Sequence, residues 1–244
     1  MSNAKTECAI ATSERSHAKA KIAVLVSGGG TNLQALIDAE KSGIIKSGTI
    51  SLVISNKKSA YALERAANAG IEAFAITRKS CGGQEGFERR LIEEIESRNI
   101  DLIIMAGFMS ILSEDFTRHF DHRIINIHPS LIPSFCGKGY YGLLVHEAAL
   151  AKGVKVTGAT VHFVNEIPDG GEIIMQKAVE VQDGDTPETL QKRVMEPAEW
   201  IILPQAAEKI CAQMCQRDGS FDTFPKTVNV SKEPSLMTHL KGDH

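Results

Sequence analysis

The sequence predicts an α/β fold of three αβα layers, in which helices cover both faces of a mostly parallel, mixed sheet. Apolar runs typical of strands alternate with helical segments from residue 21 to about residue 213. The last two apolar runs, residues 156–164 and 173–181, are joined by a short loop. That spacing allows an antiparallel pair, which makes the sheet mixed.

Each of the first five strands is a short apolar run. Their expected positions are residues 21–26, 49–55, 72–76, 101–105 and 123–128. The first is apolar almost throughout, which is typical of a strand covered on both faces. The fifth stops before Pro129, because proline has no backbone donor and cannot extend a ladder. Alternation with helices favours right-handed crossovers between these strands.

Helices are expected between and after the strands. One follows a glycine-rich turn, and residues 61–69 form a second that ends at Gly70 as a C′ glycine. A long amphipathic helix and a short one, about residues 143–152, come next. The last helix begins after Thr186, a suitable N-cap, and Pro197 should kink or break it. The residues expected to face the core are Leu33, Leu36 and Ile37 in the first helix and Phe87, Leu91, Ile92 and Ile95 in the long one.

Length and composition favour one large globular domain, or one domain with tails. The net charge of −3 and the lack of a long basic block disfavour a nucleic-acid partner. No apolar run approaches the ~20 residues of a membrane helix. Residues 1–20 are polar and lack the apolar core of a signal peptide, so we expect a disordered N-terminal extension and a cytoplasmic protein. The domain is expected at residues 21–215 and a C-terminal tail at residues 216–244. We expect a monomer or a homodimer.

The segment from Asn126 to Pro129 lies at the carboxyl end of the fifth strand. Asn126 and His128 are two residues apart, so both side chains leave the same face of the sheet. Ligands of open α/β sheets bind at this edge. An amide beside an imidazole suits the stabilisation of an oxyanion, although a histidine at a strand end is usually a structural hydrogen-bonding group.

The glycine-rich turn at residues 28–32 follows the first strand and opens a helix. Backbone amides at a helix N-terminus can bind an anion, which suggests a phosphate site. A simple tight turn is the alternative. The GxGxxG spacing and a Walker lysine are both missing, so a monophosphate is favoured over NAD or ATP.

Asp169-Gly170-Gly171 lies between the last two strands. Asp-Gly is first of all a turn signal, but a carboxylate in contact with an imidazole keeps it protonated near neutral pH. We expect His162 in the core and His146 exposed on a helix. Tyr140 and Tyr141 line a loop that could be a lid or an ordinary surface loop. The five cysteines form no CxxC pair and the histidines have no zinc spacing, so we expect free thiols and no metal.

Five segments together resemble a known family. They are Gly28–Leu36, Ala106–Met109, Asn126–Pro133, Val161–Val164 and Asp169–Gly171. Over about residues 21–213 the chain is similar to the phosphoribosylglycinamide formyltransferases of purine synthesis. The Asn-x-His-Pro-Ser-Leu-x-Pro segment is shared by the wider formyltransferase superfamily, whereas the glycine-rich turn followed by Thr-Asn-Leu-Gln is more specific to the glycinamide enzymes. The resemblance implies a Rossmann-like formyltransferase fold.

The resemblance also implies an activity, the transfer of a formyl group from 10-formyltetrahydrofolate to the amine of glycinamide ribonucleotide, without a metal. In the implied trio Asn126, His128 and Asp169, the amide and a protonated His128 stabilise the oxyanion, and Asp169 raises the pKa of His128. The implied ribonucleotide-binding residues are Gly30, Thr31, Asn32, Glu196 and Glu199, with Glu199 preferred to Glu196. The implied folate-binding residues are Gln84, Met109, Ser110, Ile111, Leu112, Asn126, Asn165, Glu166, Ile167, Pro168 and Asp169.

The chain departs from the family at two positions and leaves rival functions to test. Family members often carry arginine at the position of Ser110, and some carry a folate-contacting arginine at the position of Gln84. The loop at residues 136–142 is longer than in some relatives. Enzymes that formylate methionyl-tRNA carry an extra C-terminal domain, and hydrolases of formyltetrahydrofolate carry an N-terminal one; we expect neither here. A non-catalytic nucleotide-binding module would need only the glycine-rich turn.

Overall fold

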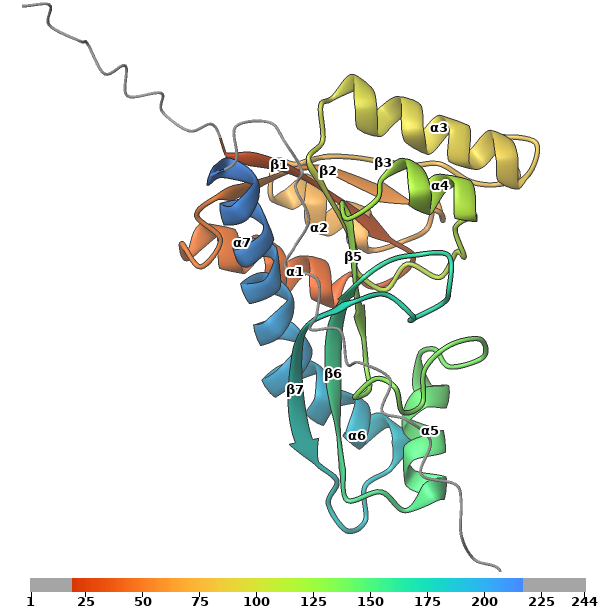
Figure 1. The fold of residues 1–244 in the computed structure, drawn as a ribbon, viewed down its shortest axis with the longest axis vertical. Helices are drawn as coiled ribbons and strands as arrows, with labels where there is room; N and C mark the ends of the chain where they lie inside the picture. Colours follow the sequence, from red (N-terminus) through yellow and green to blue (C-terminus); the bar gives the residue numbers. More distant parts are fainter. Residues whose placement is uncertain (1–18, 217–244) are drawn as a thin grey trace, which may run out of the picture.

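The structure is a computed structural model that describes residues 19–216 of the 244-residue chain. Most of the expected N-terminal extension and C-terminal tail, and Cys8, therefore lie outside the described residues. The described part forms one seven-stranded sheet in the order β3-β2-β1-β4-β5-β6-β7 (Figure 1). The strands are β1 (Ala20–Val26), β2 (Gly48–Ser55), β3 (Glu72–Ala75), β4 (Leu102–Met105), β5 (Ile124–His128), β6 (Val156–Phe163) and β7 (Ile173–Glu180).

The sheet is mostly parallel, as predicted. The pairs β1–β2, β1–β4, β2–β3 and β4–β5 are parallel, whereas β5–β6 and β6–β7 are antiparallel. Each predicted strand is present, and its ends differ from the prediction by at most one residue. Strand β5 ends at His128, directly before the proline that was expected to stop it.

Helices cover both faces of the sheet, which confirms the three-layer prediction. Buried residues of α1, α2, α6 and α7 join one core, and those of α3 and α4 join the other (Figure 1). Because side chains alternate along a strand, Val24 of β1 lies in the first core and Leu25 in the second. The helices are α1 (Thr31–Lys41), α2 (Ala62–Asn68), α3 (Gln84–Ser97), α4 (Glu114–His119), α5 (Leu143–Lys152), α6 (Pro187–Val194) and α7 (Trp200–Gln216).

Local sequence explains where the last helices begin and bend. The Thr186 side chain accepts a hydrogen bond from the backbone N–H of Thr189 and so caps α6. Around Pro197 the chain forms a π-helix, η1 (Met195–Glu199), before α7 continues, so the predicted break is confirmed. Helix α4 was not predicted, because its six residues are too few to show a periodic pattern.

The order of the strands reverses between β1 and β4, and such a switch point is where open α/β sheets bind ligands. The backbone N–H of Met109, after β4, donates to the Ser27 hydroxyl, after β1, at 2.7 Å. The two loops therefore meet at the carboxyl edge of the sheet. Within residues 19–216, the helices are all too short or too polar to cross a membrane.

Candidate active site

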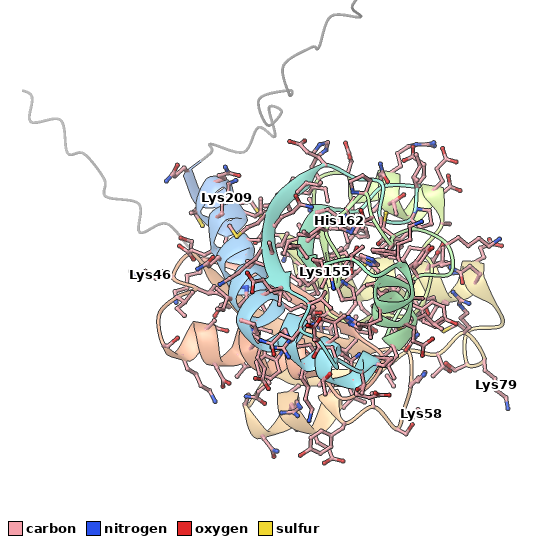
Figure 2. The ribbon with its side chains drawn as sticks, turned by 90° about the horizontal axis from the view of Figure 1, so that it is seen from below. Lys46, Lys58, Lys79, Lys155, His162 and Lys209 are labelled. Atoms are coloured by element: carbon pink, nitrogen blue, oxygen red, sulfur yellow. The ribbon has the colours of Figure 1, made fainter. Side chains whose placement is uncertain are left out.

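The core of the site lies where β5 and β6 pair. Their antiparallel register sets Asn126 opposite His162, and the Asn126 Nδ2 atom lies 3.2 Å from His162 Nε2. His128 and His162 are both buried. Figure 2 shows His162 inside the fold, whereas Lys46, Lys58 and Lys79 extend at its periphery. Two histidines and an amide from neighbouring strands are thus held in one buried polar cluster.

Asp169 completes this cluster from the loop between β6 and β7. One carboxylate oxygen lies 3.4 Å from His128 Nδ1, and the other lies 3.5 Å from His162 Nε2. The backbone N–H of Gly137 donates to the carboxylate at 2.8 Å. Asp169 has a positive φ of 56°, a conformation that aspartate tolerates better than most residues. The structure therefore brings the three predicted residues Asn126, His128 and Asp169 together.

Burial and mutual contact both shift the pKa values of His128 and Asp169. Burial lowers the pKa of His128 below its ordinary value, and this outweighs the opposing influence of Asp169 and of the Phe135 carbonyl. Burial raises the pKa of Asp169, but the neighbouring His162 and His128 rings and the backbone N–H of Gly137 together outweigh it, so the carboxyl pKa is lowered. As expected, Asp169 acts to raise the pKa of His128, but desolvation of the imidazole is the larger effect and the net shift is downward.

The hydrogen-bond partners of His128 and His162 show which nitrogen of each ring carries a proton. His128 Nε2 lies 2.9 Å from the Phe135 carbonyl, and His162 Nδ1 lies 2.7 Å from the Phe163 carbonyl. A carbonyl oxygen can only accept, so each of these nitrogens carries a proton. In the neutral rings, His128 Nδ1 is then unprotonated beside Asp169, and His162 Nε2 accepts from Asn126.

The glycine-rich turn opens α1 beside α2. Gly30 has a φ of 73°, and a Cβ there would lie 2.6 Å from the Cβ of Ala62, so only glycine fits. No side chain caps α1, which leaves the first backbone amides of the helix, from Thr31 onward, for another acceptor. Gly28 and Gly29 are exposed. Packing against Ala62 accounts for Gly30, whereas the uncapped amides and the exposed Gly28 and Gly29 leave the turn accessible to an anion.

A buried carboxylate stands beside this turn. Asn32 Nδ2 donates to the Glu199 carboxylate at 2.7 Å, which joins α1 to η1. Burial raises the pKa of Glu199 to about 6, although the hydrogen bond from Asn32 acts in the opposite direction. Glu196, in contrast, is exposed on η1. The structure thus favours Glu199 over Glu196.

Two exposed apolar segments flank the cluster. Met109 and Ile111, after β4, are 50% and 67% exposed, and Ile167, in the loop of Asp169, is 57% exposed. Glu166 and Pro168 in the same loop are also exposed. Large exposed apolar side chains at a ligand edge suit a flat, aromatic ligand. The residues present therefore fit the folate that the resemblance implies.

Other residues expected at the folate have structural partners. The Ser110 hydroxyl is buried and accepts from Asn56 Nδ2 at 2.7 Å, and Leu112 is buried. The Gln84 amide donates to the Ile111 carbonyl at 3.1 Å, and Asn165 accepts from the Ile167 backbone N–H at 3.0 Å. These contacts hold the exposed segments in place.

The structure corrects the expectation for one histidine and adds a contact to that for another. His146 of α5 was expected to be exposed, but it is 1% exposed, and neither ring nitrogen has a hydrogen-bond partner. Burial first, and then the charge of His128, lower the pKa of His146 to about 4. His162 is buried as expected, yet its Nε2 belongs to the polar cluster. Only the β5–β6 register reveals that role, since a histidine in an apolar strand gives no further signal.

The described residues contain no group of three or more His, Cys, Asp or Glu side chains that could hold a metal ion. Cys81, Cys136 and Cys211 are free thiols.

Known proteins share this architecture. Formyl transferase sequences match residues 20–207. The trifunctional purine biosynthetic protein adenosine-3 of Bos taurus is 45% identical over 196 residues, which cover 80% of this chain and 18% of that protein. The chain spans about a fifth of the length of this relative and of its counterparts from Gallus gallus and Homo sapiens.

Two relatives of similar length show the likeness over most of both chains. The phosphoribosylglycinamide formyltransferase of Escherichia coli K12 is 44% identical over 173 residues, which cover 71% of this chain and 79% of that protein. The crystal structure of glycinamide ribonucleotide transformylase 1 from Symbiobacterium toebii has a TM-score of 0.75 at 40% identity and covers 82% of this chain and 90% of its own. This chain therefore belongs to the formyl transferase family, among the phosphoribosylglycinamide formyltransferases.

Proposed function

We propose that this chain transfers a formyl group from 10-formyltetrahydrofolate to the amine of glycinamide ribonucleotide. The observation that supports this most strongly is the cluster of Asn126, His128 and Asp169 at the carboxyl edge of the sheet. The same protein carries an uncapped helix N-terminus after β1, suited to a phosphate, and exposed apolar residues after β4 and in the loop of Asp169, suited to a folate.

The reaction balances without any other reactant. The ribonucleotide amine forms a new C–N bond to the formyl carbon, and the bond between that carbon and N10 of the folate breaks. One proton leaves the amine and one is gained by N10. The protein must therefore stabilise the oxyanion of the tetrahedral intermediate and move one proton.

Asn126 is placed to stabilise the oxyanion. One of its two amide hydrogens points to His162 Nε2, which accepts it, and the other remains for the formyl oxygen. Because His162 fixes the amide in place, little reorganisation is needed when the charge develops.

The pair His128 and Asp169 is placed to move the proton. His128 is mostly neutral before reaction, because burial lowers its pKa. When the imidazole accepts the amine proton at Nδ1, it becomes an ion pair with the Asp169 carboxylate 3.4 Å away. The carboxylate thus stabilises the imidazolium during the reaction, and the proton can then pass to N10.

The remaining residues bind the two substrates. Gly30, Thr31 and Asn32 at the start of α1 bind the phosphate of the ribonucleotide, and the buried carboxylate of Glu199 accepts from its ribose hydroxyls. The folate lies against residues 109–112 and 165–169.

A direct assay tests this function. The absorbance of the folate is followed with the purified protein, with and without glycinamide ribonucleotide and in the presence of a chelator. We expect a change only when the ribonucleotide is present. Loss of the formyl group without it would instead identify a hydrolase, and thermal stabilisation by NAD alone would identify a dinucleotide-binding module.

A further inference from the structure

The guanidinium of Arg78 is held beside the exposed apolar segment after β4. Arg78 lies in the loop between β3 and α3, and its Nη2 donates to the Ile111 carbonyl at 3.2 Å. Gln84 Nε2 donates to the same oxygen at 3.1 Å. The carbonyl uses both lone pairs on these two side chains, so the cation is fixed beside Ile111, which is 67% exposed.

Arg78 differs in its partners from half of the arginines among the described residues. Arg90, Arg98, Arg118 and Arg193 each form an ion pair with a carboxylate. Among the described residues, Arg78 has no such partner. Four of its five N–H donors therefore remain for a ligand, and the side chain is exposed.

The surrounding edge of the sheet is positively charged. Strands β2 and β3 are in register up to Ser55 and Ala75, so the loops that follow them begin side by side. Residues 56–61 contain two lysines, and residues 76–84 contain one lysine and one arginine. Neither segment contains an acidic residue. Lys58 and Lys79 extend outward at the same margin of Figure 2. Helix α3, which follows, has no side-chain N-cap, although Glu85 in its first turn reduces the positive potential.

We propose that Arg78 binds a carboxylate of the glutamyl tail of the folate. This rests on the function proposed above, since a formyl folate has an aromatic part that fits Met109 and Ile111 and an anionic glutamyl tail. With the aromatic part against Met109 and Ile111, the tail reaches the guanidinium at the outer end of the segment. A guanidinium that is already held by Ile111 loses little conformational entropy on binding a carboxylate.

The neighbouring positions explain why this role falls to Arg78. Gln84 and Ser110 are uncharged, and Ser110 is buried against Asn56. Neither can supply a positive charge at this end of the site. Arg78 reaches the same Ile111 carbonyl as Gln84 from the preceding loop. The charge therefore comes from the loop, and it selects folates that carry the glutamyl group.

The test compares a folate with its counterpart that lacks glutamate. KM for 10-formyltetrahydrofolate and for 10-formyltetrahydropteroate is measured for the wild type, Arg78→Gln and Arg89→Gln. Arg89 is exposed on α3, so its replacement makes the same change in net charge as a control. We expect Arg78→Gln to raise KM for the folate about tenfold, the loss typical of one charge-assisted hydrogen bond, with kcat nearly unchanged. Its KM for the pteroate should equal that of the wild type.

The possible results separate this inference from the proposed function. An unchanged KM for the folate would overturn the role of Arg78, and so would an equal rise for folate and pteroate, which would show that Arg78 only supports Ile111. Direct binding of tetrahydrofolate and tetrahydropteroate, measured by calorimetry, gives the same comparison without turnover. If the wild type binds folate but transfers no formyl group, the proposed function is refuted. The calorimetric comparison of Arg78→Gln with the wild type then still tests the role of Arg78.

Discussion

The Asn126 amide nitrogen lies 3.2 Å from Nε2 of His162 across the antiparallel pair of β5 and β6. The other ring nitrogen of His162 donates to its neighbouring carbonyl, at Phe163, so Nε2 is the acceptor in the neutral ring. The amide of Asn126 is thereby fixed with its nitrogen toward His162. Under the proposed function, His162 is therefore a positioning residue for the oxyanion donor.

Replacement of His162 tests this relationship. His162→Leu should lower kcat about tenfold or more and leave KM for both substrates nearly unchanged, because the misplaced amide acts in the transition state rather than in substrate binding. His162→Gln should restore part of kcat, since its side-chain oxygen can accept from Asn126. A parallel rise in both KM values without loss of kcat would contradict a positioning role.

Removal of the catalytic groups should be more severe. We expect Asn126→Ala and His128→Ala each to lower kcat by about 10²–10³, the range for one oxyanion donor, while the circular dichroism spectrum stays that of the folded protein. His119→Ala, an exposed histidine of α4, serves as the control and should keep full activity. Near-normal turnover of purified His128→Ala would remove His128 from the mechanism.

The pH dependence of kcat/KM reports the protonation of His128. A neutral imidazole is needed to accept the proton, so kcat/KM should rise with pH through the His128 pKa, which burial places below its ordinary value. Asp169 raises that pKa. Asp169→Asn should therefore move the acid limb to lower pH and also lower the plateau, because the imidazolium loses its partner. An unchanged acid limb in this variant would show that Asp169 does not affect the pKa of His128.

Glu199 should limit stability at alkaline pH. Its pKa in the folded protein is about 6, above the ordinary 4.5, so the folded state binds the proton more tightly than the unfolded chain does. The protonated carboxyl therefore contributes to the free energy of unfolding at low pH, and this contribution is lost as pH rises through 6. The shift corresponds to about 2 kcal/mol. Glu199→Gln keeps the acceptor for Asn32 and should raise Tm at pH 8 by about 5 °C, measured by scanning calorimetry.

The same variant separates stability from binding. Under the proposed function, Glu199→Gln should also raise KM for glycinamide ribonucleotide, because a neutral amide is a weaker acceptor for ribose hydroxyls. An unchanged Tm at pH 8 would contradict the burial of an ionised carboxylate, whereas an unchanged KM would contradict only the contact with the ribonucleotide.

His146 should make the fold sensitive to acid. Its pKa in the folded protein is about 4 and its ordinary value is 6.5, so below pH 6.5 the unfolded chain binds a proton that the folded chain does not. Above pH 6.5 His146 is neutral in both states and does not reduce the free energy of unfolding. As pH falls from 6.5 toward 4, protonation of the unfolded chain lowers that free energy. We expect His146→Leu to raise Tm at pH 5 relative to the wild type on the order of 5 °C more than at pH 8. An equal effect at both pH values would show that His146 does not titrate during unfolding.

The order of the elements and the edge at which the site lies could be predicted from the sequence alone. Apolar runs gave each strand because a strand buried on both faces must be apolar along its length, as in β1. Pro129 ended β5 and Thr186 began α6 through local backbone chemistry, which requires no knowledge of the rest of the chain. Asn126 and His128 share a face because the period of a strand is two residues.

Contacts between distant groups, and the charges that these groups carry, depend on how the whole chain packs. The contacts of Asp169 with two histidines, of Asn32 with Glu199 and of Arg78 with Ile111 join segments whose spacing in the sequence gives no distance in space. Burial depends on packing from every side, so the sequence could not show that His146 is covered or that desolvation outweighs Asp169 at His128. Local geometry follows from neighbouring residues, whereas electrostatics depends on everything that surrounds a group.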